Sequence, residues 1–279
     1  MVRPPPVLNR SLYCSSSRSS SASGPLFSSR ESRVEGSSKK IPIVVQRDLQ
    51  LLFSDRLLLV IMFVNFTIDL GISGLSLAAM IKGFNYFLYI APGANLVTAT
   101  VAAFQSGRDI WRERVLTDLE PYLLTLPVSR SRFALSRLLS GMVRVTIVTM
   151  PGTIVISELY GLSFPLFLVA VLLMWIYSAA VIGISDITAT LSNSLEVFTT
   201  ARSTVNVYLS FFSTLFYPAS FLPPPVRILS AANPMTWAVE SFRALGSGMV
   251  DLSVIASLAF LSVVLLTAGY VFYIRSMIE

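Results

Sequence analysis

Six stretches of mostly apolar residues, each long enough to cross a lipid bilayer, dominate this sequence. A helix needs about 20 such residues to cross roughly 30 Å of hydrocarbon. The predicted spans cover residues 57–81, 84–104, 142–160, 165–187, 205–222 and 252–274. We therefore predict an all-α integral membrane fold with six transmembrane helices.

Composition supports this fold class and narrows the chemistry. Only 13% of the residues are charged, whereas an ordinary soluble domain carries roughly 25%. The chain has no histidine and a single cysteine, Cys14, so an internal disulfide is excluded and the commonest metal ligand and general base are missing. We expect no catalytic, cofactor-binding or metal-binding residues, and a membrane-embedded enzyme has little to work with.

The distribution of Lys and Arg predicts the orientation. The net charge of +6 could indicate a nucleic-acid partner, but the basic residues lie beside the apolar spans, which is typical of topology determinants. They gather before the first span and between the second and third, so we place both termini in the cytoplasm and the chain in the cell membrane. We predict no nucleic-acid partner.

The chain divides into a tail and a membrane domain. Residues 1–40 are rich in Ser and Arg and poor in aromatic residues, which predicts a disordered cytoplasmic tail. A transit peptide and a misplaced start codon are the alternatives. Residues 41–279 form the predicted transmembrane domain.

Two connections between spans are too long to be simple turns, and such segments often carry function. In the first, residues 105–141, leucines recur at helical spacing. This predicts short amphipathic helices at the cytoplasmic interface, with Glu113, Asp118 and Glu120 facing the cytosol.

The second connection, residues 223–251, is predicted to form an external pair of short helices that dips back into the outer leaflet. Asn233 and Pro234 stand at the bend and are expected to pack on neighbouring spans, because irregular backbone at membrane depth must be covered by protein. Glu240 and Arg243 are three residues apart on one helix face, which predicts an ion pair.

Asp69 is the only ionisable residue that we place well inside a predicted span. A carboxylate at that depth is costly enough to suggest a role in a transport pathway. The alternative is a position near the outer surface.

Several short motifs resemble those of the membrane subunits of type-2 ATP-binding-cassette (ABC) exporters. They are Tyr89-x-x-Pro92-Gly93 near the start of the second span, the run Pro127 to Arg130, and the late Asn233-Pro234 bend followed by Glu240-x-x-Arg243. The resemblance covers roughly residues 41 to 279. The chain departs from the family pattern at Thr117 and Asp118, which stand where Gly and Thr are common.

The resemblance implies a permease subunit that forms half of a transmembrane pathway. Its implied partners are a cytoplasmic ABC ATPase, a second permease subunit and membrane lipid. ATP and Mg²⁺ would lie on the ATPase, since this chain has no Gly-x-x-x-x-Gly-Lys-Ser/Thr motif. The implied contacts with the ATPase are Arg112, Glu113, Arg114, Asp118 and Glu120.

The apolar spans fit a hydrophobic or amphipathic cargo, such as a drug or a lipid-like molecule, and they fit a passive lipid-facing wall equally well. A polysaccharide or glycolipid exporter is one alternative, and a non-transporting membrane scaffold of the same fold is another. The resemblance also assigns residues 41–55 to an interfacial connecting helix and residues 108–126 to the coupling element.

Overall fold

The computed structural model describes residues 41–54, 56–80, 85–117, 119–125 and 129–277. The predicted tail, residues 1–40, lies outside them. All secondary structure in the described ranges is helical. The elements are α2 (Ile41–Ser54), α3 (Arg56–Ile68), the π-helical η1 (Asp69–Gly74), α4 (Leu75–Met80), α5 (Tyr86–Trp111), the π-helical η2 (Arg112–Leu116), α6 (Leu119–Leu124), α7 (Arg130–Tyr160), α8 (Phe164–Leu191), α9 (Leu195–Phe211), the 3₁₀ turn η3 (Ala219–Phe221), α10 (Pro224–Ala231), α11 (Pro234–Gly246) and α12 (Leu252–Ser276).

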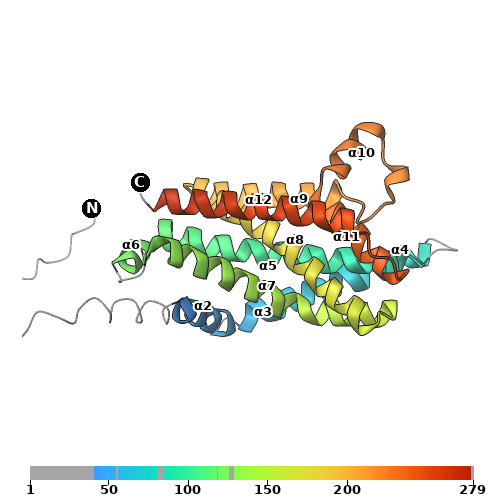
Figure 1. The fold of residues 1–279 in the computed structure, drawn as a ribbon, viewed down its shortest axis with the longest axis horizontal. Coiled ribbons are helices and arrows are strands. Elements are labelled where there is room, and N and C mark those ends of the chain that lie inside the picture. Colours follow the sequence, from blue (N-terminus) through green and yellow to red (C-terminus); the bar gives the residue numbers. More distant parts are fainter. Residues whose placement is uncertain (1–40, 55, 81–84, 118, 126–128, 278–279) are drawn as a thin grey trace, which may run out of the picture. The chain divides into compact units, whose positions relative to one another are not determined.

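Within the described residues, four helices are long and apolar enough to cross a membrane. They are Tyr86–Leu116 (α5 with η2), Arg130–Tyr160, Phe164–Leu191 and Leu252–Ser276. They correspond to the second, third, fourth and sixth predicted spans. In Figure 1 they run side by side along the longest axis of the molecule.

The first and fifth predicted spans differ from this simple form. The first consists of α3, η1 and α4, which follow one another from Arg56 to Met80 with a π-helical segment in the middle. The fifth, predicted over 205–222, is instead the helix α9, which begins at Leu195 and ends at Phe211. Over the described residues the structure therefore supports four of the six predicted spans as single long helices.

Helix α8 lies at the centre of the packing and contacts α5, α7, α11 and α12. Its closest approach to α12 takes place at glycines. A Cβ atom on Gly183 would collide with the backbone of Leu265, and one on Gly269 would collide with the backbone of Gly183. Such small-residue contacts let two membrane helices pack backbone to backbone.

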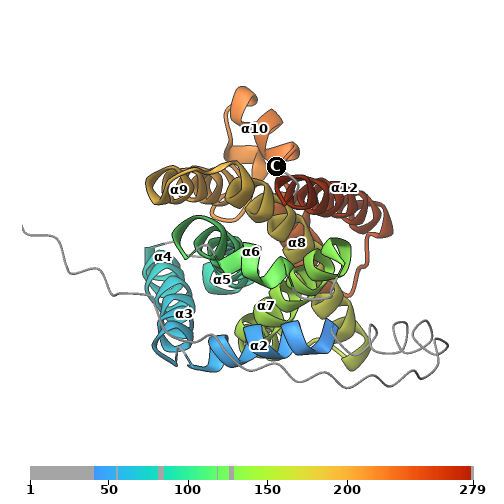
Figure 2. The ribbon, with the colours of Figure 1, turned by 90° about the vertical axis from the view of Figure 1, so that its left-hand side faces the viewer.

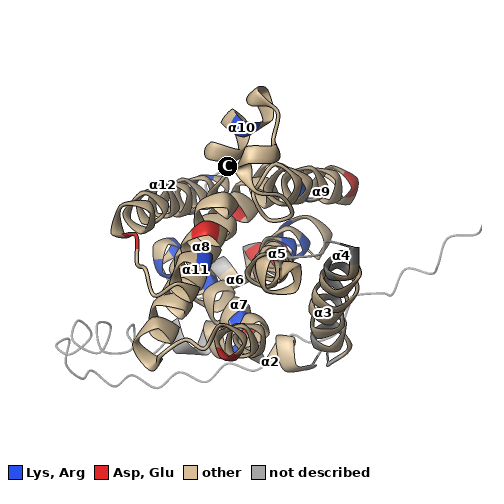
Figure 3. Ribbon diagram, turned by 90° about the vertical axis from the view of Figure 1, so that its right-hand side faces the viewer, with Lys and Arg blue, Asp and Glu red and all other residues tan. Residues whose placement is uncertain are grey.

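The bundle has two ends, which we call the α6 end and the α11 end. At the α6 end, Tyr270 near the end of α12 donates to the Ser131 carbonyl at the start of α7. At the other end lie α4, α10 and α11 (Figure 1). Figure 2 looks onto the α6 end, and Figure 3, which looks onto the α11 end, shows that most of the ribbon is uncharged.

Two charged residues that fall inside the predicted spans are buried in the long helices. Arg144 on α7 is 6% exposed and Asp186 on α8 is 1% exposed. Both stand at the edge of a predicted span that the structure extends. That Asp69 is the only ionisable residue well inside a span stays a prediction. Asp69 itself begins η1, and its side chain lies outside the described part of the structure.

Candidate functional site

Four charged side chains meet at the α6 end, and we call them the charge cluster: Arg47, Asp48, Glu113 and Arg137. Arg137 donates from Nη1 to both carboxylate oxygens of Asp48, each at 3.1 Å, and also pairs with Glu113. Arg47 bonds Asp48 at 2.9 Å and Glu113 at 3.1 Å. Two acids and two bases from α2, η2 and α7 therefore balance one another.

Three of the four members of the charge cluster are almost fully removed from solvent, whereas the Arg47 side chain is 30% exposed. Asp48, Glu113 and Arg137 are each 4–5% exposed. Removing one partner from a buried ion pair leaves an uncompensated charge, which typically costs about 3–5 kcal/mol. The cluster therefore fixes α2 and the coupling segment firmly onto α7.

A second ion pair links α5 to α7 further along the same two helices. Arg144 donates from Nη2 to Asp109 at 2.6 Å. On one helix the acids Asp109 and Glu113 are four residues apart, and on the other Arg137 and Arg144 are seven apart. Both spacings return a side chain to the same helix face, so the two pairs form successive rungs between the helices.

The segment η2 also closes the end of α8. Arg114 donates from Nη2 to the carbonyl oxygens of Ala189 at 3.1 Å and Thr190 at 2.7 Å. Trp111 donates from Nε1 to the Ser192 carbonyl at 3.1 Å. The last carbonyls of a helix have no partner within it, and an arginine is well suited to that position.

Helix α6 is held against α12 by Glu120. This side chain is 5% exposed, and Tyr273 on α12 hydrogen-bonds to it. Its Oε1 atom is buried without a partner. Burial raises the pKa of Glu120 above its ordinary value, while the bond to Tyr273 and the charge of Arg114 lower it to a smaller extent.

The predicted partner contacts therefore have different surroundings from those expected. The prediction that Glu113 and Glu120 face the cytosol is wrong for this chain, because both are buried in contacts with its own helices. Arg114 caps α8. Arg112 is exposed and lies 3.9 Å from Asp109, and Asp118 falls outside the described residues.

The exposed surface of η2 and α6 is instead largely apolar. Leu116 is 66% exposed and Tyr122 is 71% exposed, with Val115 and Leu119 each at 39%. Arg112 adds one positive charge at the edge of this surface. We call Arg112, Val115, Leu116, Leu119 and Tyr122 the coupling surface.

At the α11 end, a proline in α5 sets up a different arrangement. Pro92 has no N–H group, so the carbonyl of Leu88, four residues earlier, loses its helical donor. Tyr160 from the end of α7 supplies one, with its hydroxyl 2.8 Å from the Leu88 oxygen. The neighbouring Gly93 is also needed, because a Cβ atom there would collide with the side chain of Leu215.

The chain after α9 forms an irregular segment, residues 212–217, which we call the α9 turn. Its carbonyl groups accept hydrogen bonds from tyrosines on α5. Tyr86 donates to the Phe216 carbonyl at 2.6 Å and Tyr89 donates to the Thr214 carbonyl at 3.1 Å. Irregular backbone at membrane depth is tolerated only when protein satisfies it in this way.

Asn233 closes the end of α9. Its Nδ2 atom lies within 3.0–3.1 Å of the carbonyl oxygens of Tyr208, Leu209 and Phe212, while its Oδ1 accepts from the Met235 N–H and so caps α11. Asn233 is completely buried and Pro234 is buried beside it. The prediction of packing on a neighbouring span is confirmed for Asn233, and for Pro234 the structure shows burial.

Arg243 on α11 reaches the same region. It donates to the carbonyls of Tyr89, Thr214 and Leu215 at 2.9–3.0 Å, and its guanidinium carbon lies 3.4 Å from the centre of the Tyr89 ring. The predicted ion pair with Glu240 is wrong. Glu240 is exposed, and the guanidinium is used instead to satisfy backbone oxygens.

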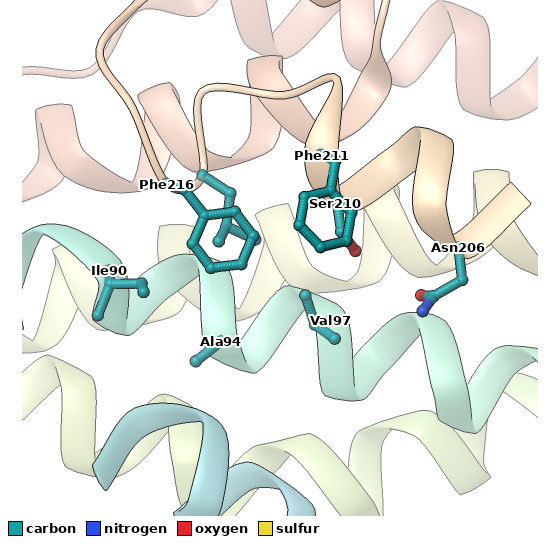
Figure 4. A pocket seen from close by; sticks show the side chains of 8 residues that line it. Ile90, Ala94, Val97, Asn206, Ser210, Phe211 and Phe216 are labelled. Atoms are coloured by element: carbon teal, nitrogen blue, oxygen red, sulfur yellow. The ribbon is translucent and has the colours of Figure 1, made fainter. Parts of the chain in front are cut away.

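Between α5 and α9 lies a groove with two cavities. The one nearer the α11 end has a volume of about 170 Å³ and is lined by Ile90, Ala94, Val97, Asn206, Ser210, Phe211, Leu215 and Phe216. Figure 4 shows Phe211 and Phe216 facing Ala94 and Val97 across it. The second cavity, about 340 Å³, is lined by Thr100, Val101, Phe104, Thr199, Arg202, Ser203 and Asn206.

The sequence reasoning above did not identify the charge cluster or the groove. The seven-residue spacing of Arg137 and Arg144 was a usable signal, because two arginines on one face of a membrane helix require acidic partners. Asp48 carried no comparable signal, since its partners lie on distant segments. The groove residues are ordinary for a membrane helix and could not be singled out.

Comparison with known proteins agrees with this architecture. A search of curated proteins finds no match to the chain. The family model described as "ABC-2 type transporter" matches residues 40–247, which includes the charge cluster, the α9 turn and both sides of the groove. The chain therefore belongs to the ABC-2 type transporter family and is a multi-pass membrane permease of an ABC transporter.

Proposed function

We propose that this chain is one membrane half of an exporter that is driven by ATP hydrolysis on a separate ATPase subunit. The observation that carries the proposal is the coupling surface. It is an exposed, largely apolar patch on short helices at one end of the long spans, which is where a docked ATPase would act.

The residues beneath that surface make it suitable for transmitting force. Glu113 joins it to α7, Arg114 joins it to α8, and Glu120 joins it to α12. A displacement of the short helices would therefore move these three long helices together, as in domain-level gating transitions. In this proposal Leu116, Tyr122 and Arg112 contact the ATPase, and the buried charges position them. Direct contact by Asp118 remains a prediction.

The proposed orientation places the α6 end in the cytoplasm and the α11 end outside the cell. It rests on the excess of Lys and Arg before the first span and between the second and third. Both termini are then cytoplasmic, in the plasma membrane, and the pair α10 and α11 lies at the outer leaflet.

The proposed pathway lies along the groove between α5 and α9, completed by a second permease subunit of the same or a related kind. A hydrophobic or amphipathic cargo suits the groove, because its outer cavity is mostly apolar. A sugar polymer needs many hydrogen-bonding partners, and that cavity offers only Asn206 and Ser210. A polysaccharide exporter and a non-transporting scaffold remain the alternatives.

The test is gentle purification of the tagged chain from its native membrane, followed by identification of what remains bound. We expect an ATPase with a Walker motif in equal amount. Leu116→Asp should abolish its recovery, because a charge replaces an apolar contact. The matched control is Ile228→Asp on α10, which is 73% exposed at the opposite end and should leave recovery unchanged.

Two outcomes would count against the proposal. Purification without any ATPase under several mild conditions would favour the scaffold alternative. Equal loss of the ATPase in Leu116→Asp and Ile228→Asp would mean that the coupling surface has been placed wrongly.

A further inference from the structure

The arginine in the groove differs from those elsewhere in the spans. Arg202 lies on α9 and lines the larger cavity, and it is only partly exposed. Among the described residues it has no carboxylate within 4.0 Å and no hydrogen-bond acceptor. Arg137, Arg144 and Arg243, in contrast, are all bound to acids or carbonyls. A partly buried cation without a partner is costly in a membrane protein unless something else neutralises it.

The surroundings of Arg202 favour an anion. Its cavity is lined by the hydroxyl-bearing residues Thr100, Thr199 and Ser203, and none of the lining residues is acidic. The hydroxyls of Thr100 and Thr199 also bond to carbonyls of their own helices. Arg108, one turn beyond Phe104 on α5, is close enough to act electrostatically on Arg202 as a second positive charge. Guanidinium groups together with hydroxyl groups are the usual recognition chemistry for phosphate and carboxylate.

The adjoining cavity has the opposite character. Apart from Asn206 and Ser210, its lining is aliphatic and aromatic. Asn206 is shared by the two cavities, and its Oδ1 atom is buried without a hydrogen-bond partner. From Phe104 to Ile90 the lined face of α5 extends about 20 Å at the helical rise of 1.5 Å per residue. One end of the groove therefore suits a charge and the other suits an alkyl or aromatic chain.

We propose that the groove binds anionic amphiphiles, with a phosphate or carboxylate head on Arg202 and an apolar tail between Ile90, Val97 and Phe216. This inference rests on the proposed function, since it names the cargo class of the same pathway. It selects anionic molecules over neutral and cationic ones of the same length.

The test uses two fluorescent probes with the same dansyl-labelled dodecyl chain, one ending in phosphate and the other in trimethylammonium. Binding is measured by fluorescence anisotropy on the full chain in nanodiscs of phosphatidylcholine, with empty nanodiscs subtracted. The variants are Arg202→Gln, which removes the charge; Arg202→Lys, which keeps it; and Val97→Trp, which fills the apolar cavity. Arg227→Gln, on an exposed external arginine, is the matched control.

We expect the phosphate probe to bind more tightly than the ammonium probe. Arg202→Gln should weaken phosphate-probe binding by about tenfold or more, the effect of losing one charge-assisted hydrogen bond, and should leave the ammonium probe unaffected. Arg202→Lys should retain most of the affinity, and Val97→Trp should weaken both probes. Millimolar inorganic phosphate should fail to displace the phosphate probe, because a free anion lacks the tail.

Equal binding of the two probes, or an equal loss in Arg202→Gln and Arg227→Gln, would overturn the inference. So would displacement by inorganic phosphate alone, which would indicate a simple anion site. Retained binding in Val97→Trp together with a changed oligomeric state would show that a second copy fills the groove. These outcomes are separable from the proposed function. A failed probe test with an ATPase still recovered removes only the cargo class, and successful binding without an ATPase removes only the coupling.

Discussion

Buried charges on α2, η2 and α7 stand where an apolar core would ordinarily lie. Each acid of the charge cluster touches both arginines, so a single neutral substitution unbalances the whole group. Glu113→Gln leaves Arg137 and Arg47 sharing one carboxylate. We expect it to lower the stability of the purified chain by about 3 kcal/mol, seen as a reduced melting temperature in detergent. Glu196→Gln, at an exposed position on α9, should change it little, and similar melting temperatures for the two variants would contradict the assignment.

The two roles of Asn233 can be separated by substitution, because its side-chain oxygen and its side-chain nitrogen bond to different helices. Asn233→Asp keeps the oxygen that caps α11 but removes the amide that serves the carbonyls of α9. Each unsatisfied buried group costs about 1–3 kcal/mol. We therefore expect a large loss of thermal stability, close to that of Asn233→Ala. If Asn233→Asp kept the wild-type melting temperature, the cap on α11 would be the only contribution of this residue.

Glu120 gives the chain a pH dependence of definite sign. A carboxyl group whose pKa is raised on folding binds its proton more tightly in the folded state. Its stabilising contribution is therefore present below the unfolded pKa and lost as the pH rises through the folded value. From about pH 5 to about pH 8 the wild-type melting temperature should fall more than that of Glu120→Gln. Parallel curves for the two proteins would argue against this assignment.

At the scale of elements, the sequence predicted the long helices well and their ends poorly. The apolar content of α8 and α12 left little choice of structure. Helix α7 begins at Arg130, well before its predicted start, because Arg137 and Arg144 are paired with acids and can lie inside the protein. Those acids belong to other segments, so no local sequence pattern in α7 predicts the pairing.

Helix α9 shows the opposite error. Residues 212–222 are apolar enough to continue a span, yet the helix ends at Phe211. Asn233, Arg243 and the tyrosines of α5 supply hydrogen bonds to carbonyls that a continued helix would have used internally. The Tyr89-x-x-Pro92-Gly93 and Asn233-Pro234 motifs were visible in the sequence. The sequence did not show that both contact the end of α9 and the α9 turn.

The contact between α8 and α12 is a property of the two helices together. Gly183→Ala places a methyl group against the Leu265 carbonyl, and backbone cannot move aside as a side chain can. We expect a loss of about 1–3 kcal/mol from overpacking, measured as a lower melting temperature. Gly71→Ala is the control, since nothing lies within 4 Å of the added atom. An unchanged Gly183→Ala would mean that the two helices are farther apart than described.

At the scale of the whole molecule, the proposed pairing of two permease chains raises the question of which face of the chain contacts the second copy. If two copies enclose a pathway, the groove between α5 and α9 faces the partner. In a background with Cys14 replaced by Ser, Val207→Cys on α9 should form a disulfide between copies in membranes. Val263→Cys on α12, which is 63% exposed, should not. Cross-linking at position 263 alone would place the interface on the opposite side.

The attachment of α9 has a mechanical consequence. Its C-terminal end is fastened by Asn233 and followed directly by the fastened α9 turn, whereas towards its N-terminus Phe198 is the one fully buried side chain, stacked on Trp111 with ring centres 6.5 Å apart. Because α9 is held mainly at its C-terminal end, its N-terminal end can be displaced farther. In the proposed orientation this attachment lies near the outer leaflet, and we expect a displacement from the cytoplasmic side to open the cavity around Arg202 before the apolar one. Cargo would then be admitted head first and released tail last.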